Sequence, residues 1–134
     1  MKQLNEEDKQ LLLKDLSARL PYGVKIHVKG EYKRAHKIYS IGVENEFVSY
    51  FEAMHLYDVV IAKCVPYLRP MSSMTGEEKE TYKNLFISKE VDGFDFDIPN
   101  YDAVDWLLEH HFDFRGLLEK GLALEAPADM YNTK

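Results

Sequence analysis

The stretch Val24-Lys25-Ile26-His27-Val28-Lys29 alternates apolar and polar residues without a break. A period of two is typical of a β-strand with one face in the core and the other in solvent. Residues 5–20 precede it and carry leucines at helical spacing, which predicts an amphipathic helix beginning after Asn5. Pro21-Tyr22-Gly23 separates the two elements, so a helix is expected to lead directly into a sheet.

Further strands are predicted downstream of this one. Residues 32–43 and 47–53 are rich in β-branched and aromatic residues, and residues 59–65 form a more apolar run expected to end at Pro66. Short consecutive strands with tight connections favour an antiparallel meander or a bent, barrel-like sheet of about four strands.

Helices are predicted again in the C-terminal half. Thr75 and Glu78 have the spacing of a capping box, in which each side chain bonds the other residue's backbone N–H, so a helix should begin there. A long acidic connection over residues 88–100 then leads to a helix at about 101–111.

The chain should close with a short helix over residues 114–120, capped by Asp113. With two to three C-terminal helices, the overall prediction is an α+β fold. Its length fits a single domain, residues 1–134, with a loose tail from about residue 128.

Composition excludes several classes of protein. Hydrophobic residues make up 46% of the chain, enough for a packed core rather than disorder. Cys64 is the sole cysteine, so an intrachain disulfide is impossible, and its apolar surroundings predict a buried, unreactive thiol. Acids stand where a signal peptide needs an apolar run, and no window approaches the roughly 18 apolar residues of a membrane span. A cytoplasmic location without a membrane partner is therefore expected.

Three segments in a fixed order carry a recognisable pattern: residues 16–25 (LSARLPYGVK), 66–75 (PYLRPMSSMT) and, after Trp106, 110–127 (HHFDFRGLLEKGLALEAP). Together they resemble a family of small proteins encoded in gut bacteria, often beside phage or mobile-element genes. The resemblance implies an accessory protein of a phage or integrated element, and it brings no activity with it. Residues 30–62 and 87–100 lie outside the pattern, so a function located there would be particular to this chain.

The first candidate binding site comprises Tyr67, Arg69, Ser72 and Ser73. A guanidinium can hold a phosphate or carboxylate through two hydrogen bonds, and the free N–H groups of a following helix also attract anions. In the structural interpretation, Thr75 is only a helix cap, Met71 and Met74 fill a gap in the core, and Arg69 pairs with an acid.

The second candidate site comprises His110, His111, Asp113 and Arg115. Two imidazoles and a carboxylate are able to bind zinc or transfer protons. Neighbouring helical residues point about 100° apart, so a metal here would need a remote ligand, with His27, His36 and His55 as the options. In the structural interpretation, one histidine completes the apolar stripe, the other meets helix-end carbonyls, and Asp113 is a cap.

Two charged segments complete the candidates. Residues 92–97 alternate acids with Gly93 and phenylalanines, but their order does not match a calcium-binding loop, so an exposed acidic hairpin or loop is predicted. A basic strip is formed by Lys25, Lys29, Lys33, Arg34 and Lys37, interleaved with His27, His36, Tyr32 and Tyr39. Such a strip suits single-stranded nucleic acid, and it equally suits the solvated face of a sheet.

The net charge of −6 disfavours non-specific nucleic-acid binding, which depends on neutralising phosphates. The sequence contains no nucleophile elbow, phosphate-binding loop or dinucleotide fingerprint, and we assign no catalytic residue, metal or cofactor from it. The leading hypothesis is a non-enzymatic protein that binds a host or phage protein through its tyrosine-rich sheet or the 88–100 connection. The alternatives are a nucleic-acid-binding factor using the basic strip and a small metal-dependent hydrolase using the histidine pair.

Overall fold

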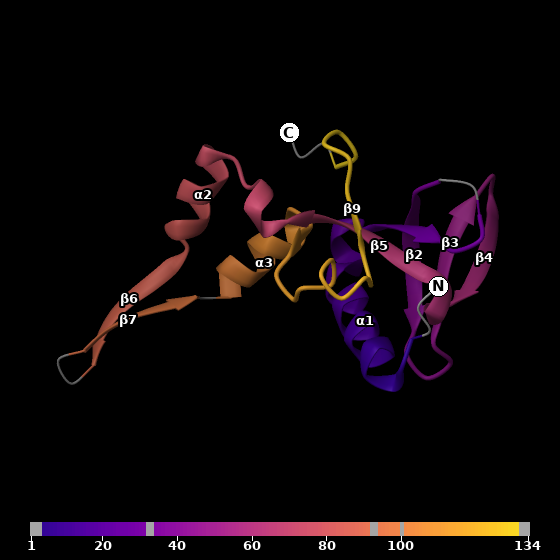
Figure 1. Ribbon diagram of the computed structural model, residues 1–134, viewed down its shortest axis with the longest axis horizontal. Helices are drawn as coiled ribbons and strands as arrows, with labels where there is room; N and C mark the ends of the chain where they lie inside the picture. Colours follow the sequence, from indigo (N-terminus) through magenta and orange to yellow (C-terminus); the bar gives the residue numbers. More distant parts are fainter. Residues whose placement is uncertain (1–3, 32–33, 92–93, 100, 132–134) are drawn as a thin grey trace.

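The computed structural model describes residues 4–31, 34–91, 94–99 and 101–131, and for those of them that lie between 86 and 101 it describes the backbone alone. The helices are α1 (Glu6–Arg19), α2 (Gly76–Lys83) and α3 (Tyr101–Glu109). The strands are β1 (Lys25–Val28), β2 (His36–Gly42), β3 (Phe47–Glu52), β4 (His55–Val60), β5 (Cys64–Pro70), β6 (Phe86–Val91), β7 (Phe94–Pro99), β8 (Phe112–Asp113) and β9 (Leu124–Glu125). Figure 1 shows β2–β4 at one end of the long axis and the β6–β7 hairpin at the other.

Helix α1 forms as its sequence predicts. The Asn5 side chain accepts a hydrogen bond from the Asp8 N–H at 2.7 Å, which satisfies one of the free donors at the helix start. Leu12, Leu13 and Leu16 are buried against the sheet. The helix ends in a turn of 3₁₀ helix, after which Gly23 adopts the left-handed conformation that favours glycine.

The main sheet is a meander to which the chain later returns. Strands β1 to β4 pair antiparallel in sequence order, and β5 returns to lie antiparallel to β1 on its other side. The short strands β8 and β9 then pair parallel with β5, which gives seven strands in the order β4-β3-β2-β1-β5-β8, with β9 also on β5. The prediction of a meander is confirmed, whereas the sheet does not close and has more than the four strands expected.

The predicted single strand over 59–65 is wrong. Strand β4 ends at Val60, a 3₁₀ turn over Ile61–Lys63 reverses the chain, and β5 begins at Cys64 and continues through Pro66 to Pro70. Pro66 is tolerated because β5 pairs only with β1 at that point, and the pairing with β9 starts one residue later, at Tyr67. A proline's missing N–H costs little on a side without a partner strand.

The predicted helix over 114–120 is also wrong. Gly116 has φ +76°, and a residue in the left-handed conformation cannot continue a right-handed helix. Consecutive turns form instead, and Leu122 N–H bonds back to Leu117 O at 2.9 Å. The tail expected to be loose from about residue 128 is anchored at Tyr131, whose hydroxyl donates to Tyr67 O at 2.8 Å.

Two clusters of buried side chains hold these elements together. The larger joins α1 to the sheet and includes Val24, Ile26, Ile38, Val48, Leu68 and Leu117. The smaller contains Met74, Leu107 and Phe112, with Met71 and Trp106 packed against it, and it attaches α2 and α3 to the end of β5. None of the helices in the described residues has the length and apolarity that a membrane crossing requires.

Candidate functional site

Arg69 is held within the protein rather than offered to an anion. Its guanidinium donates two hydrogen bonds to the Glu78 carboxylate, at 2.9 and 2.7 Å, and lies 4.1 Å from the centre of the Phe112 ring. The same carboxylate accepts from the Thr75 N–H, which completes the predicted capping box. The hydrogen bonds from Arg69 lower the pKa of Glu78, which favours the ionised carboxylate. These contacts match the structural interpretation, as does Met74 in the core.

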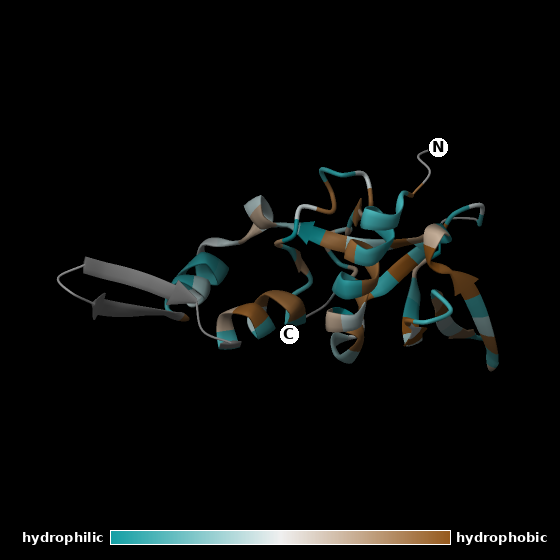
Figure 2. Cartoon of the chain, turned by 90° about the horizontal axis from the view of Figure 1, so that it is seen from below, coloured by the Kyte–Doolittle hydropathy of each residue, from teal (hydrophilic) through white to brown (hydrophobic). Residues whose placement is uncertain are grey.

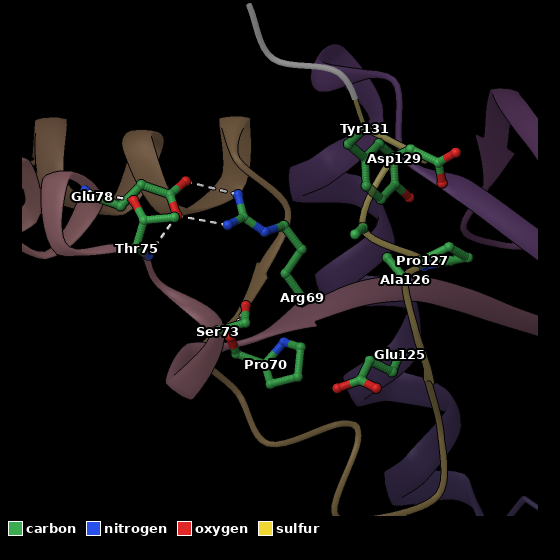
Figure 3. A pocket seen from close by; sticks show the side chains of 11 residues that line it. Arg69, Pro70, Ser73, Thr75, Glu78, Glu125, Ala126, Pro127, Asp129 and Tyr131 are labelled. Carbon is green, nitrogen blue, oxygen red and sulfur yellow. Dashed lines mark hydrogen bonds and ion pairs between the residues drawn. The ribbon is translucent and has the colours of Figure 1, made fainter.

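A cleft of about 870 Å³ lies beside this pair and is shown in Figure 3. Its walls come from the end of β5, the start of α2 and the segment that follows β9. Ser73 lines it, with its hydroxyl donating to Pro70 O at 2.6 Å. Because Arg69 and Glu78 neutralise each other, the remaining charges on the walls are the carboxylates of Glu125 and Asp129. That charge pattern is unfavourable for a phosphate or carboxylate ligand.

The two neighbouring histidines have separate partners. His110 contacts Trp106 O through Nδ1 at 2.8 Å and tilts against the Trp106 ring, whose centre lies 4.4 Å away. His111 is buried and stacks on Tyr131 at 3.6 Å between ring centres. His111 also has φ +63°, which turns the chain out of α3 and directs the two imidazoles apart.

Asp113 and Arg115 serve structure as well. The Asp113 carboxylate accepts from the N–H groups of Leu117 and Leu118, at 2.9 and 2.8 Å. It is therefore a cap, as predicted, although of a turn rather than a helix. Arg115 Nε donates to Asp15 Oδ1 at 3.1 Å. His110, His111 and Asp113 therefore have separate partners, and in the described residues the group of possible metal ligands lies elsewhere, around His36.

The sequence did not predict that Arg115 binds Asp15, nor that Asp15 forms a buried ion pair with Arg19 inside α1. Asp15 and Arg19 are fully buried, and Arg19 Nε donates to Asp15 Oδ2 at 2.7 Å. Arg19 Nη2 also donates to Phe112 O at 2.6 Å, which ties α1 to β8. The only sequence signal was the i, i+4 spacing of opposite charges on the leucine-bearing side of the helix.

Burial has a measurable consequence at His111. Loss of hydration, with the nearby positive charge of Arg19 as a lesser cause, lowers the pKa of His111 to about 4. The unfolded chain binds this proton below about pH 6.5 and the folded chain does not, so stability is retained above that pH and lost as the pH falls toward 4. We expect this group to reduce the free energy of unfolding by about 2 kcal/mol between pH 7.5 and pH 5.

The His111→Asn variant is the matched control, because asparagine tolerates the left-handed conformation at this position. Urea unfolding at both pH values should show a pH-dependent loss about 2 kcal/mol smaller in the variant than in the wild type. Equal losses in the two proteins would show that the imidazole is already accessible to protons in the folded state.

The residues of the basic strip have different surroundings and do not form one solvated surface. Lys25 donates through Nζ to Met130 O, Arg34 pairs with Glu52, and Lys29 lines an apolar cleft under the C-terminal segment. Lys37 is exposed, and Lys33 lies outside the described residues. The C-terminal segment therefore crosses the strand face that was expected to be solvated. Cys64 is buried, and burial raises the pKa of its thiol to about 12, as expected for an unreactive side chain.

Among the side chains that the structure describes, the exposed large apolar ones are concentrated on the meander. Of the ten large apolar side chains that are exposed in the described residues, eight fall between positions 39 and 60. Five share one side of the sheet and are called the outer face: Tyr39 of β2, Phe47 and Phe51 of β3, and Leu56 and Val60 of β4. In the pairing of β3 with β4, Phe47 lies opposite Val60 and Phe51 lies opposite Leu56, so these four side chains are neighbours. The rings of Tyr39 and Phe51 meet edge to face, with 4.7 Å between their centres.

This surface continues to the end of the sheet. Strand β4 is the edge strand, with β3 as its one neighbour, so one row of its backbone N–H and C=O groups has no strand partner in the described sheet. Met54, in the turn before β4, is 96% exposed. In Figure 2, hydrophobic colouring recurs on the strands at this end of the molecule.

No family model, curated protein or solved structure matches this chain.

Proposed function

We propose that this protein binds another protein through β4 and the outer face, without catalysing a reaction. The observation that carries the proposal is the concentration of exposed apolar side chains on the edge of an otherwise ordinary sheet. Single exposed apolar residues are common and need no explanation, whereas a contiguous group of them typically marks an interface. Aromatic residues dominate the group, as they do in the centres of protein interfaces.

The partner is expected to supply an extended segment that adds a strand to β4. Natural edge strands are usually protected from unwanted strand pairing by lysine, proline or a bulge, and β4 contains neither lysine nor proline. Its one acid, Asp58, accepts a hydrogen bond from Ser49 within the sheet. Backbone hydrogen bonds to β4 would supply affinity, and apolar side chains at alternate positions of the partner would pack against Phe51, Leu56 and Val60.

The resemblance to phage-associated and mobile-element-associated proteins is consistent with this proposal. Accessory proteins of phages and mobile elements commonly need to engage a host or phage protein, and the outer face lies within the 30–62 region that the shared pattern omits. The choice of partner would then belong to this chain rather than to its relatives.

Photo-crosslinking tests the proposal at the outer face itself. Benzoylphenylalanine replaces Phe51 in cells of the host, with and without phage, and the linked protein is identified by mass spectrometry. With that partner purified, we expect hydrogen exchange to slow at the amides of His55–Val60. We also expect Leu56→Lys to weaken affinity by at least about tenfold, or 1.4 kcal/mol.

Val104→Lys is the matched control, since Val104 is an exposed apolar residue on α3 and is not part of β4 or the outer face. It should leave affinity unchanged. The proposal is wrong if Phe51 captures no protein under either condition, or if Leu56→Lys and Val104→Lys have the same effect. Crosslinks between two copies of this chain would assign the surface to self-association instead.

A further inference from the structure

Three side chains of the types that bind metal ions lie close together beside the β1–β2 connection. Glu31 follows β1, His36 begins β2 and Glu52 ends β3. Each offers one ligand atom, and these atoms all lie within 4.8 Å of one another. His36 Nε2 lies 3.5 Å from Glu31 Oε1 and makes no hydrogen bond in the described structure.

His36 is the unusual member of this group. The residue is only 6% exposed, yet its buried Nε2 has no hydrogen-bond partner in the described structure. A buried polar nitrogen without a partner is costly, and such atoms in native proteins call for an explanation. The ring is also held in place, because it stacks on Tyr50 with 4.0 Å between centres.

We propose that Glu31, His36 and Glu52 bind a divalent transition-metal ion, with Zn²⁺ as the reference. One imidazole and two carboxylates form a mixed nitrogen–oxygen set that suits such ions better than calcium or magnesium, which take oxygen ligands. Bonds of about 2.0–2.1 Å in a tetrahedral site place neighbouring ligand atoms about 3.3 Å apart. The observed 3.5 Å between His36 and Glu31 is close to that spacing.

The carboxylates have competing partners that metal binding must displace or share. Glu52 pairs with the guanidinium of Arg34, and Glu31 Oε2 accepts a hydrogen bond from the Tyr50 hydroxyl at 3.3 Å. Arg34 is largely exposed, so its pairing is weak and a metal ion should exchange with it readily. Removing the guanidinium should therefore raise metal affinity.

The bound ion would connect three parts of the sheet. Glu31 belongs to the β1–β2 connection, whereas His36 and Glu52 stand on the neighbouring strands β2 and β3. Coordination would fix that connection against the sheet. Three protein ligands also leave a position for water or for a group supplied from outside, as in open metal sites. This inference is independent of protein binding at the outer face, because it involves different residues.

Untagged protein, stripped with chelator, provides the test with Zn²⁺ and Co²⁺ as probes. We expect one ion per chain by native mass spectrometry, a visible absorption band for the Co²⁺ form, and a higher thermal unfolding temperature with Zn²⁺. Glu31→Gln and Glu52→Gln should each lower Zn²⁺ affinity by at least about tenfold. Arg34→Gln should raise it.

Glu44→Gln is the control, because Glu44 is an exposed acid in the β2–β3 turn, at the opposite end of these strands from His36 and Glu52. These glutamine variants change the surface and should remain folded, whereas His36→Ala would open a buried site. Absence of a bound ion in the wild type would overturn the inference. Affinities in Glu31→Gln and Glu52→Gln equal to that in Glu44→Gln would overturn it too.

Discussion

The Asp15→Ala variant is expected to lose about 3–5 kcal/mol of unfolding free energy, a large part of the stability of a domain of this size. Asp15 is fully buried and accepts hydrogen bonds from Arg19 and Arg115. Its removal leaves the fully buried Arg19 guanidinium with Phe112 O as its one remaining hydrogen-bond partner in the described residues. An uncompensated buried charge is among the most destabilising defects a mutation can create.

Equilibrium unfolding in urea measures this loss, with Lys9→Ala as the matched control. Lys9 is also on α1 and pairs with Glu46 at 3.7 Å, but both side chains are partly exposed. Removal of such a surface pair should cost about 1 kcal/mol or less. A loss in Asp15→Ala no larger than that in Lys9→Ala would mean that water reaches Arg19 in solution.

The hydrogen bonds among Asp15, Arg19 and Arg115 also predict that replacing Asp15 and replacing Arg19 will cost different amounts of unfolding free energy. Arg19→Met should cost less than Asp15→Ala, because Asp15 then keeps Arg115 as a partner and methionine retains much of the buried volume. The double variant Asp15→Leu/Arg19→Met removes both charges and should recover much of the loss, since apolar replacement of a whole buried ion pair is often neutral or stabilising. A double variant less stable than Asp15→Ala would contradict this.

Local signals account for the parts of the fold that were predicted. The alternation at Val24–Lys29 became β1, the leucine stripe became the buried side of α1, and Thr75 with Glu78 formed the capping box. In each case the interacting residues are close in sequence, so the spacing alone carries the information. The β4–β5 break was missed because the apolar residues around the turn at Ile61–Lys63 resemble one continuous strand.

The candidate site was harder because its contacts are remote in sequence. Arg19 meets Phe112, and Asp15 meets Arg115, across about a hundred positions. The sequence placed His36 in the basic strip and offered it as a remote ligand for the His110–His111 site, and its acidic neighbours come from separate elements. The sequence predicted a tyrosine-rich sheet surface without naming its residues, and only Tyr39 of the five outer-face residues is a tyrosine. The grouping of Phe47 with Val60 and of Phe51 with Leu56 depends on the register between β3 and β4, which no local pattern encodes.

Phe112→Ala is expected to destabilise the protein by about 3–5 kcal/mol. Phe112 is fully buried at the centre of the smaller core cluster, where its ring stacks on Trp106 at 5.6 Å between centres and supports the Arg69 guanidinium. Deleting the ring removes both contacts and leaves a cavity between α3 and β5, so the cost exceeds that of the lost apolar area alone. Trp106 is the sole tryptophan, and its fluorescence reports unfolding at this cluster.

Phe51→Ala provides the matched control, because the same side chain is removed from a position that is 51% exposed. It should change stability by about 0.5 kcal/mol at most. Phe112→Leu should lie between the two, since leucine refills part of the cavity. If α2 and α3 unfold separately from the sheet, Trp106 fluorescence in Phe112→Ala will change at a lower urea concentration than the far-ultraviolet circular dichroism signal. Coincident transitions with a loss below about 1 kcal/mol would instead show that the smaller cluster adds little to the cohesion of the fold.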